Sequence, residues 1–397
     1  MFERLERMPT DPILGLMQAF RADPDAQKVD LGVGVYRNDR GETPVLEAVR
    51  KAEQAVLGRQ TSKTYVAPAG NAGFNEGMER LTFGEGHPAL KANRVRSIQA
   101  PGGCGALRVG AELIMRAKPD ATVYVSTPTW ANHVPLLTGS GMKLEQYPYY
   151  DGKTGGVNFS AMMDALDKIP ARSIVLLHAS CHNPTGADLS EAQWHDVLAL
   201  VKRRSLIPYI DMAYQGLGTG VAEDAFGCRL FAAELPEVIV AVSCSKNFGL
   251  YRERTGVLHV ITETVPAAEA ILSQLVRIAR TLYSMPPDHG AAIIQEILAN
   301  DALRGSWADE LGGMRNRIAS LRRDLVVKLA KACPQRDFSF IERQRGMFSF
   351  LGVTKEQVHA LRERHHVYMT DDSRMNIAGL KADNIAYFAN AVASVLS

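Results

Sequence analysis

Short apolar runs alternate with stretches of helical spacing through the middle of the chain, and this alternation limits the fold more than any other feature. The runs have the length of buried strands, and most are followed by a polar cluster or a glycine turn before a helical pattern begins. Strands that alternate with helices in this way form a mostly parallel sheet covered by helices. We therefore predict an α/β fold whose strands include residues 97–100, 122–126, 173–178, 207–211 and 238–242.

The last part of the chain has a different pattern, which indicates a second, smaller unit. A long helical pattern over residues 307–330 is followed by short strand-like stretches near 338–341, 346–350 and 375–378, and then by a final helix. No linker-like segment separates the two parts, so the smaller unit is expected to combine both ends of the chain. We predict an N-terminal arm at residues 1–12, a large domain at 45–311, and a small α+β domain from 13–44 and 312–397.

Charge and cysteine content argue against several classes of protein. The 397 residues include 45 lysines and arginines against 43 aspartates and glutamates, for a formal charge of +2. Such a balance gives no basic surface for nucleic acid or membrane, and no apolar run is long enough to cross a bilayer. The first residues lack the apolar core of a signal peptide, and the five cysteines form no CxxC pair. We expect a cytoplasmic protein with reduced thiols and no metal site.

Lys246 is the strongest single candidate for a catalytic residue. It follows the apolar run 238–242, so we expect it at the end of a buried strand, where loss of hydration lowers the pKa of an amine and makes it nucleophilic. Ser243 and Ser245 precede it and Arg254 follows it, and these residue types suit a phosphate dianion. A lysine that can form a Schiff base beside a phosphate site is what pyridoxal phosphate requires. The simpler alternative is a solvated lysine at a strand end.

Other strand ends carry residues that are weak signals when each is taken alone. The glycine turn at 102–105 begins a helix, and amide groups at such a helix start can bind an anion. Asn183 precedes a proline, which keeps it out of the helical region, and Asp211 ends a strand where open α/β sheets bind ligands. Trp130, just past a strand end, could stack on an aromatic cofactor, but such a residue is equally often at a rim.

Taken in order along the chain, these motifs resemble those of the fold-type I pyridoxal-phosphate aminotransferases. The resemblance extends from residues 11–16 to residues 373–379 and is closest to the aspartate and aromatic-amino-acid aminotransferase subgroup. It implies a mostly parallel seven-stranded sheet between helices, a smaller α+β domain and a homodimer. The residues that carry it are Tyr65, Gly103, Cys104, Trp130, Asn183, Asp211, Tyr214, Ser243, Ser245, Lys246 and Arg254.

The resemblance assigns the central chemistry to Lys246 and Asp211. Lys246 would form the covalent link to pyridoxal phosphate and, once displaced by substrate, would move the substrate proton. Asp211 would pair with the nitrogen of the cofactor ring and keep it protonated. His133 and His178 would support Asp211 from behind; the alternative is that they are core histidines with satisfied hydrogen bonds.

The remaining cofactor residues would orient the ring and hold the phosphate. Tyr214 and Asn183 would hydrogen-bond the oxygen of the ring, which favours the deprotonated form of the Schiff base. Trp130 would stack on the ring. The phosphate would be held by Gly103, Cys104, Ser243, Ser245 and Arg254, with Tyr65 reaching it from the second subunit.

Two arginines would bind the carboxylates of the substrate. Arg374 matches the family position that pairs with the α-carboxylate through two hydrogen bonds, with Gly34, Trp130 and Asn183 around it. Arg280 matches the arginine that reaches across the dimer to the side-chain carboxylate of aspartate or glutamate. Its presence implies that one of the two substrates is a dicarboxylic acid, and it does not exclude aromatic substrates.

Four positions bear on the choice between aromatic and acidic substrates. Met285 and Thr64 stand where aspartate-specialised relatives usually carry asparagine, so the pocket around Arg280 would be less polar and more adaptable. Val35 and Thr43, in contrast, are common in the aspartate enzymes. We predict dual specificity for aromatic amino acids and dicarboxylates, with 2-oxoglutarate as the usual acceptor. The alternative is an aspartate aminotransferase with little aromatic activity.

Cys104 departs from the family pattern, because relatives usually carry threonine or serine there. A thiol donates weakly, so one hydrogen bond to the phosphate should be weaker. Other fold-type I enzymes, such as lyases and decarboxylases, use the same lysine and aspartate, but the paired arginines favour transamination. A regulator with a disabled aminotransferase domain would need a DNA-binding domain or a lost lysine, and neither is seen in this sequence.

Overall fold

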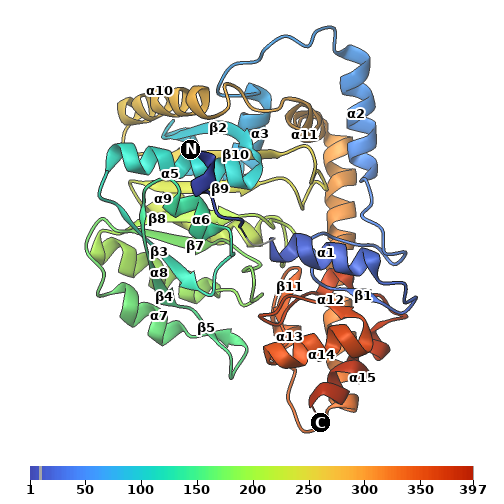
Figure 1. Ribbon diagram of the computed structural model, residues 1–397. Helices are drawn as coiled ribbons and strands as arrows, with labels where there is room; N and C mark the ends of the chain where they lie inside the picture. Colours follow the sequence, from blue (N-terminus) through green and yellow to red (C-terminus); the bar gives the residue numbers. More distant parts are fainter. Residues whose placement is uncertain (9–10, 397) are drawn as a thin grey trace. The chain divides into compact units, whose positions relative to one another are not determined.

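The computed structural model describes residues 1–8 and 11–396, which form two compact units (Figure 1). The predicted boundaries of an arm and two domains, at residues 12, 44 and 312, stay predictions, and residues 9 and 10 of the predicted arm lie outside the described part. The smaller unit draws on both ends of the chain. The larger unit comprises Pro44–Arg317 and Gln344–Gly346, and the smaller comprises Met1–Thr43, Ile318–Arg343 and Met347–Ser397.

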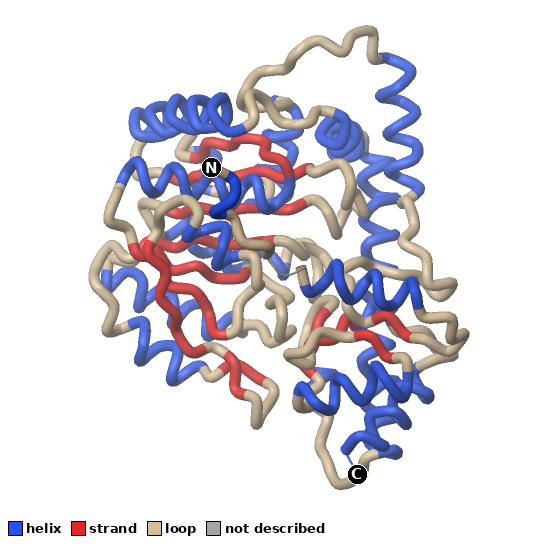
Figure 2. Tube along the Cα trace, in the orientation of Figure 1, coloured by secondary structure: helices blue, strands red, loops and turns tan. Residues whose placement is uncertain are grey.

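A seven-stranded sheet forms the centre of the larger unit, and this confirms the predicted fold class (Figure 2). The strand order is β2-β10-β9-β8-β7-β3-β4. Neighbouring strands run parallel except around β10, which is antiparallel to both β2 and β9. The strands are β2 Val95–Pro101, β3 Thr122–Thr127, β4 Lys143–Pro148, β7 Ile174–His178, β8 Ile207–Met212, β9 Val238–Ser243 and β10 Thr255–Ile261.

Strands β4 and β10 are absent from the sequence-based prediction. Strand β4 lies at one edge of the sheet and is mostly exposed, so it lacks the apolar run of a buried strand. Strand β10 is fully buried and mostly apolar, with Thr255 and His259 as its polar residues. Its direction follows from the connection before it, because the loop of residues 244–254 is too short for the helical crossover that a parallel neighbour of β9 would need.

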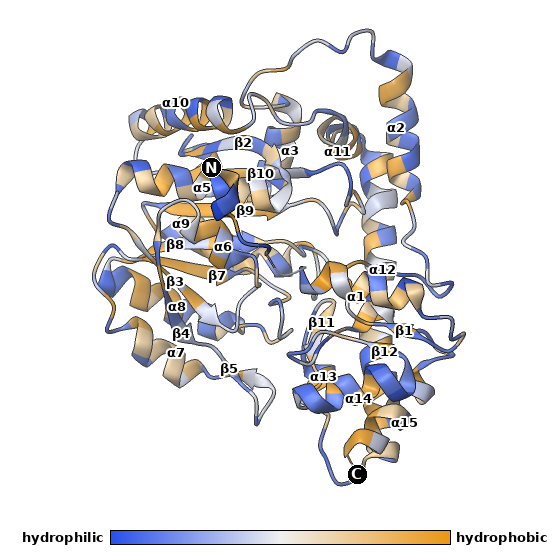
Figure 3. Ribbon diagram, in the orientation of Figure 1, coloured by the Kyte–Doolittle hydropathy of each residue, from blue (hydrophilic) through white to orange (hydrophobic). Residues whose placement is uncertain are grey.

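Alternate strand residues point to opposite faces of the sheet, and helices cover both faces. On one face, Leu176 and Tyr209 belong to an apolar core shared with α5 (Gly102–Ala117) and α10 (Val265–Leu282). On the other face, Ser97 and His259 contact α3 (Ala72–Phe83). Figure 3 shows apolar residues concentrated along the central strands. Other helices of this unit are α2 Glu47–Arg59, α4 Pro88–Lys91, α6 His133–Thr138, α7 Phe159–Leu166, α8 Glu191–Arg204, α9 Phe226–Glu234 and α11 His289–Ala299.

The smaller unit is built from short strand pairs and helices, as expected for an α+β unit. The buried Arg322 joins its parts, because the guanidinium donates to the backbone oxygens of Ile341 at 2.8 Å and Phe348 at 2.6 Å. Helix α12 (Asp301–Ala332) contributes its first part to the larger unit and its second part to the smaller. The other elements are α1 Pro12–Ala22, β1 Val29–Asp30, α13 Phe340–Arg343, β11 Phe348–Phe350, α14 Lys355–His365, β12 Val367–Tyr368, β13 Arg374–Asn376 and α15 Ile385–Leu396.

Within the described residues, no helix combines the length and the apolar character that a membrane crossing would require.

A buried histidine on the α3 face of the sheet has both ring nitrogens satisfied. His259 Nδ1 lies 2.7 Å from Ser97 Oγ, and Nε2 lies 3.3 Å from Thr82 Oγ1. Ser97 in turn donates to Glu79 Oε1 at 2.5 Å. Burial lowers the pKa of His259 from 6.5 to about 3, so the folded protein holds this ring neutral.

Acid should therefore destabilise the folded protein through His259. Between pH 6.5 and about 3 the unfolded chain binds a proton at this ring that the folded state does not bind. As the pH decreases through that range, the free energy of unfolding should decrease by at most about 1.4 kcal/mol per pH unit for this group. Denaturant titrations at a series of pH values give the slope of the unfolding free energy against pH. This slope should be smaller in His259→Asn than in the wild type, whereas the control His195→Asn, which changes an exposed residue, should keep the wild-type slope. Identical slopes in all three proteins would contradict this expectation.

Candidate active site

Most of the predicted cofactor residues gather at one edge of the sheet in the larger unit. The parallel strands β3, β7, β8 and β9 end at this edge, which is where open α/β sheets bind ligands. Trp130 follows β3, His178 ends β7, and Asp211 lies near the end of β8. Lys246 lies in the loop that follows β9.

The carboxylate of Asp211 is buried and bonded to a buried histidine. His133, the first residue of α6, places Nε2 3.0 Å from Asp211 Oδ2, and its Nδ1 lies 2.8 Å from Thr129 Oγ1. Thr129 Oγ1 also lies 3.2 Å from His178 Nε2. Burial by itself disfavours the ionised carboxylate, but the hydrogen bond from His133 and nearby positive charge outweigh it, so the pKa of Asp211 is lowered. Asp211 therefore carries a negative charge at neutral pH.

Lys246 has the properties of a nucleophilic amine. Its Nζ lies 5.1 Å from the ring centre of Tyr214, and desolvation by the surrounding residues lowers its pKa. The charge of Asp211 opposes this shift, and the charge of Arg254 adds to it. The result is a larger share of neutral amine at neutral pH than an exposed lysine has.

Asn183 and Tyr214 lie together at the same edge. Asn183 Nδ2 is 3.4 Å from Tyr214 Oη, and both side chains are buried. Asn183 Oδ1 is buried and has no hydrogen-bond partner among the described residues. Trp130 contacts His133 edge to face, with ring centres 5.2 Å apart. A polar pair and an aromatic ring thus adjoin Asp211.

A cradle for an anion lies beside Lys246, formed by Gly102, Gly103, Ser243, Ser245 and Arg254. Gly102 and Gly103 begin α5, where amide groups are available and the helix dipole favours negative charge. Ser245 N donates to Ser243 Oγ at 3.3 Å, and Arg254 Nη1 donates to Ser245 Oγ at 3.4 Å. A Cβ at Gly102 would lie 2.4 Å from Arg254 Nη2, and one at Gly103 would lie 2.9 Å from Ser243 Cβ. Only glycine leaves room for this arrangement.

Two predicted residues of the larger unit do not contact this group. Tyr65 is 88% exposed, in the loop that joins α2 to α3 and extends away from the sheet in Figure 1. Arg280 is exposed in the last turn of α10, and its guanidinium donates to Ser284 Oγ. Thr64 is also exposed, whereas Met285 is partly buried.

Two predicted substrate residues lie in the smaller unit, next to one phenylalanine. The guanidinium of Arg374 lies over the ring of Phe348 at 4.6 Å and donates to Gly32 O at 2.8 Å. A Cβ at Gly34 would lie 2.8 Å from Phe348 Cζ, so the backbone at Gly34 approaches the same ring closely. Gly34 and Arg374 are thus brought together by Phe348.

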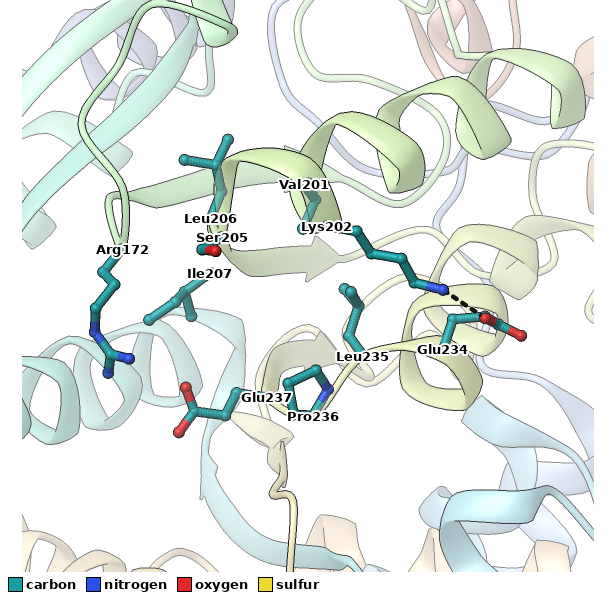
Figure 4. Close-up of a pocket in the computed structure, with 10 residues that line it drawn as sticks. All are labelled: Arg172, Val201, Lys202, Ser205, Leu206, Ile207, Glu234, Leu235, Pro236 and Glu237. Atoms are coloured by element: carbon teal, nitrogen blue, oxygen red, sulfur yellow. Dashed lines mark hydrogen bonds and ion pairs between the residues drawn. The ribbon is translucent and has the colours of Figure 1, made fainter.

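A surface hollow lies at the opposite edge of the sheet, near the starts of β8 and β9 (Figure 4). Its floor is apolar, with Leu206 and Leu235 among its residues, and charged side chains surround it. Lys202 on its rim donates to Glu234 Oε2 at 2.6 Å. None of the predicted site residues lines this hollow.

Comparison with known proteins identifies the family. The family model described as "Aminotransferase class I and II" matches residues 26–392. The chain belongs to this aminotransferase family. It is 46% identical, over 394 residues, to an aromatic-amino-acid aminotransferase of Pseudomonas aeruginosa, and the match covers 99% of this chain and 98% of the relative. It is also 43% identical, over 396 residues, to an aspartate aminotransferase of the same organism, with 100% of both chains covered.

A solved structure gives the same family. The crystal structure of an aromatic-amino-acid aminotransferase from Burkholderia pseudomallei, covalently bound to pyridoxal phosphate, superposes with a TM-score of 0.98. The two chains are 47% identical, and 100% of each is covered. Pyridoxal phosphate is the cofactor of this aminotransferase.

The larger unit of the aminotransferase fits this cofactor. The anion cradle suits its phosphate, because a Cβ at Gly102 or Gly103 would fill the space where the amides and Arg254 meet. The ionised Asp211 suits a protonated ring nitrogen. Asn183 Oδ1, which has no partner among the described residues, is a buried polar atom that a ring with a polar substituent could satisfy, and Tyr214 lies beside it.

Several polar residues around the aminotransferase site were not predicted from the sequence. Thr129 joins His133 to His178, and Asn132 Nδ2 lies 3.6 Å from Cys104 Sγ. Asp188 binds the turn that carries Asn183. These residues lie directly beside the sequence motifs of the family resemblance, and this position was the only sequence signal for them. The sequence could not give their partners, because a polar residue in a loop follows no periodic pattern.

Cys104 lies in the first turn of α5, next to the cradle, and is partly exposed. Replacement by threonine supplies a hydroxyl, which is a stronger hydrogen-bond donor than a thiol. We predict that Cys104→Thr slows release of pyridoxal phosphate about fivefold, the effect of a hydrogen bond worth about 1 kcal/mol.

The release rate can be measured by mixing the enzyme with an excess of a cofactor-free acceptor protein, which captures the released cofactor. The absorbance of the cofactor bound to the enzyme is then followed as it decreases. Cys104→Ala is the matched control, because it removes the thiol without adding a donor, and its release should be no slower than in the wild type. Equal rates for the wild type and Cys104→Thr would show that the thiol donates as well as a hydroxyl there.

Proposed function

We propose that this aminotransferase transfers amino groups from aromatic amino acids and from aspartate or glutamate to 2-oxo acids, with 2-oxoglutarate as the usual acceptor. The reaction type rests mainly on one observation, the buried amine of Lys246 next to the ionised Asp211 and the anion cradle. The substrate range is supported by the aromatic-amino-acid and aspartate aminotransferases to which the chain is similar.

Lys246 and Asp211 have complementary roles in this proposal. When bound, pyridoxal phosphate supplies an electron-accepting ring for the charge left on the substrate Cα. Lys246 Nζ, with its lowered pKa, would accept the proton from the substrate Cα as a general base and would donate it to the carbon on the other side of the substrate nitrogen. Asp211, kept ionised with the help of His133, would stabilise a proton on the ring nitrogen.

The other residues of the site orient the cofactor. Asn183 and Tyr214, which lie side by side, would donate to the ring oxygen, and Trp130 would stack on the ring. The phosphate would be held by Gly103, Cys104, Ser243, Ser245 and Arg254, with Tyr65 reaching it from a second copy.

Arg374 and Arg280 bind the two carboxylates of a dicarboxylic substrate. Arg374 is held by Phe348 and Gly32, which orients a planar group that can pair with a carboxylate through two hydrogen bonds, beside Gly34. Arg280 serves the side-chain carboxylate in the active site of a second copy. Arg280 and Tyr65 are both exposed in the single chain, and this exposure supports a homodimer in which each residue contributes to the active site of the second copy.

Dual specificity is proposed from the residues around Arg280. Met285 is partly buried and would give the pocket of Arg280 an apolar, adaptable surface, and Thr64 would add no amide there. An aromatic ring is accommodated when Arg280 moves aside. The alternative is an aspartate aminotransferase with little aromatic activity, and Val35, Thr43 and the 43% identity to an aspartate enzyme favour it.

The test is a comparison of kcat/KM for phenylalanine, tyrosine and tryptophan with kcat/KM for aspartate, all with 2-oxoglutarate. Dual specificity predicts values for the best aromatic substrate within about 100-fold of the value for aspartate, a difference that pocket contacts can account for. A preference for aspartate of several orders of magnitude would establish the alternative. Lys246→Ala should lack both the yellow colour and turnover, and the absence of keto-acid formation by the coloured wild type would disprove transamination.

Met285→Asn should shift the enzyme towards acidic substrates. An amide at this position can hydrogen-bond its surroundings and hold Arg280 in a polar network, which hinders the movement that an aromatic ring requires. The ratio of kcat/KM for aspartate to that for phenylalanine should rise about tenfold, equivalent to about 1.4 kcal/mol. Met285→Leu keeps the apolar character and should leave the ratio near that of the wild type. An unchanged ratio in Met285→Asn would remove this residue from the determinants of specificity.

A further inference from the structure

The turn between β7 and α8 is held by one carboxylate. Asp188 Oδ2 accepts a hydrogen bond from the backbone N–H of Cys181 at 2.7 Å, and Oδ1 accepts one from the N–H of His182 at 2.8 Å. Cys181 has a φ of +52°, a conformation that is uncommon for any residue other than glycine. Two hydrogen bonds to a charged acceptor at this point stabilise a backbone shape that the chain would not otherwise favour.

The remainder of the turn is hydrogen-bonded to His182, one of the two residues that Asp188 holds. Gly186 N donates to His182 O at 2.7 Å, and Thr185 Oγ1 lies 2.9 Å from His182 Nδ1. Arg345 N donates to Gly186 O at 2.7 Å and so closes the other end. Residues 181–187 are all buried. Asn183 therefore lies in a short, fully bonded turn between the two anchored ends.

We infer that Asp188 is a positioning residue, which holds Asn183 beside Tyr214 by accepting both amide hydrogens at the start of the turn. The consequence falls on the cofactor, because Asn183 and Tyr214 are the residues proposed to contact the ring oxygen. The inference thus rests on the proposed function for those two roles. Asp188 itself touches neither substrate nor cofactor in this account.

The electrostatic surroundings make this contact sensitive to acid. Desolvation by the turn raises the pKa of Asp188 to about 6, against the opposing effect of its two amide hydrogen bonds. The charge of Asp224 raises this pKa further, and the charge of Arg345 lowers it. The other titratable groups nearby stay neutral: burial raises the pKa of Tyr149 and lowers that of His182. The charged carboxylate accepts from both amides, and protonation as the pH falls through about 6 would weaken the bond to one of them.

Asp188→Asn tests the inference in the holoenzyme, because it keeps the shape of the side chain but places an NH₂ group against one of the two amides. Misplacing Asn183 weakens the hydrogen bond to the ring oxygen, which favours the protonated form of the bound cofactor. The pH midpoint of the cofactor absorbance should rise by about half a unit or more. The dissociation constant of pyridoxal phosphate should rise about tenfold, the loss expected for one hydrogen bond to a charged group.

Two further variants separate positioning from general damage. Asp151→Asn changes a carboxylate that accepts from the N–H of Lys153 at 2.9 Å on the β5–β6 hairpin (Tyr150–Asp151 and Gly156–Val157), and it should leave both values unchanged. In an Asn183→Ala background, Asp188→Asn should cause little further shift of the midpoint. A wild-type midpoint and affinity in Asp188→Asn, or equal shifts with and without Asn183, would overturn the inference.

A measurement on the wild-type protein covers the case in which Asp188→Asn fails to fold. Hydrogen exchange in the segment 180–188, corrected for its intrinsic pH dependence, should lose protection as the pH falls through about 6. Constant protection across that range would also overturn the inference. Failure of the proposed function is distinct, because it would appear as absence of turnover in the wild type, whatever the behaviour of Asp188→Asn.

Discussion

The hydrogen bond between His133 and Asp211 is the interaction on which the site depends. A carboxylate in this buried position would normally be protonated, because desolvation disfavours the charge. His133, at the start of α6, reverses that outcome at a distance of 3.0 Å, and Thr129 fixes the other nitrogen of the ring. The charge of Asp211 then limits how far burial can lower the pKa of Lys246. One hydrogen bond thus sets the ionisation of both groups that the proposed reaction uses.

Strands that are buried on both faces were predictable, since a continuous apolar run is what such burial demands. Strands β7, β8 and β9 have this character, whereas β3 is only partly buried. All four are parallel, so the polar residues at their ends lie on one edge of the sheet. The edge strand β4 escaped prediction because its residues face water as well as the core. Strand β10 escaped because Thr255, Gly256 and His259 interrupt its apolar run, although the strand is buried throughout.

The hydrogen-bond partners within the site were less predictable than its central residues. Thr129 and Asp188 act through loops, where distance along the chain does not determine distance in space. Tyr65 and Arg280 were assigned by resemblance alone, and their exposure in a single chain agrees with a role that needs a second copy. Substrate specificity is harder still to predict, because the role proposed for Met285 depends on the movement of Arg280 and not on a substrate contact of its own.

The reversed direction of β10 also has a consequence for the order of assembly. Because β10 runs antiparallel to β2, Thr255 lies opposite Pro101, and this pairing brings Arg254 to the first glycine of α5. The cradle is therefore assembled from segments that lie far apart in the chain, and contacts of that kind form late in folding. During synthesis, a chain whose β10 has not yet left the ribosome can have β9, β8, β7, β3 and β4 paired and still lack the cradle, because β2 pairs only with β10 in this sheet. Capture of the cofactor would then report that the central sheet is complete.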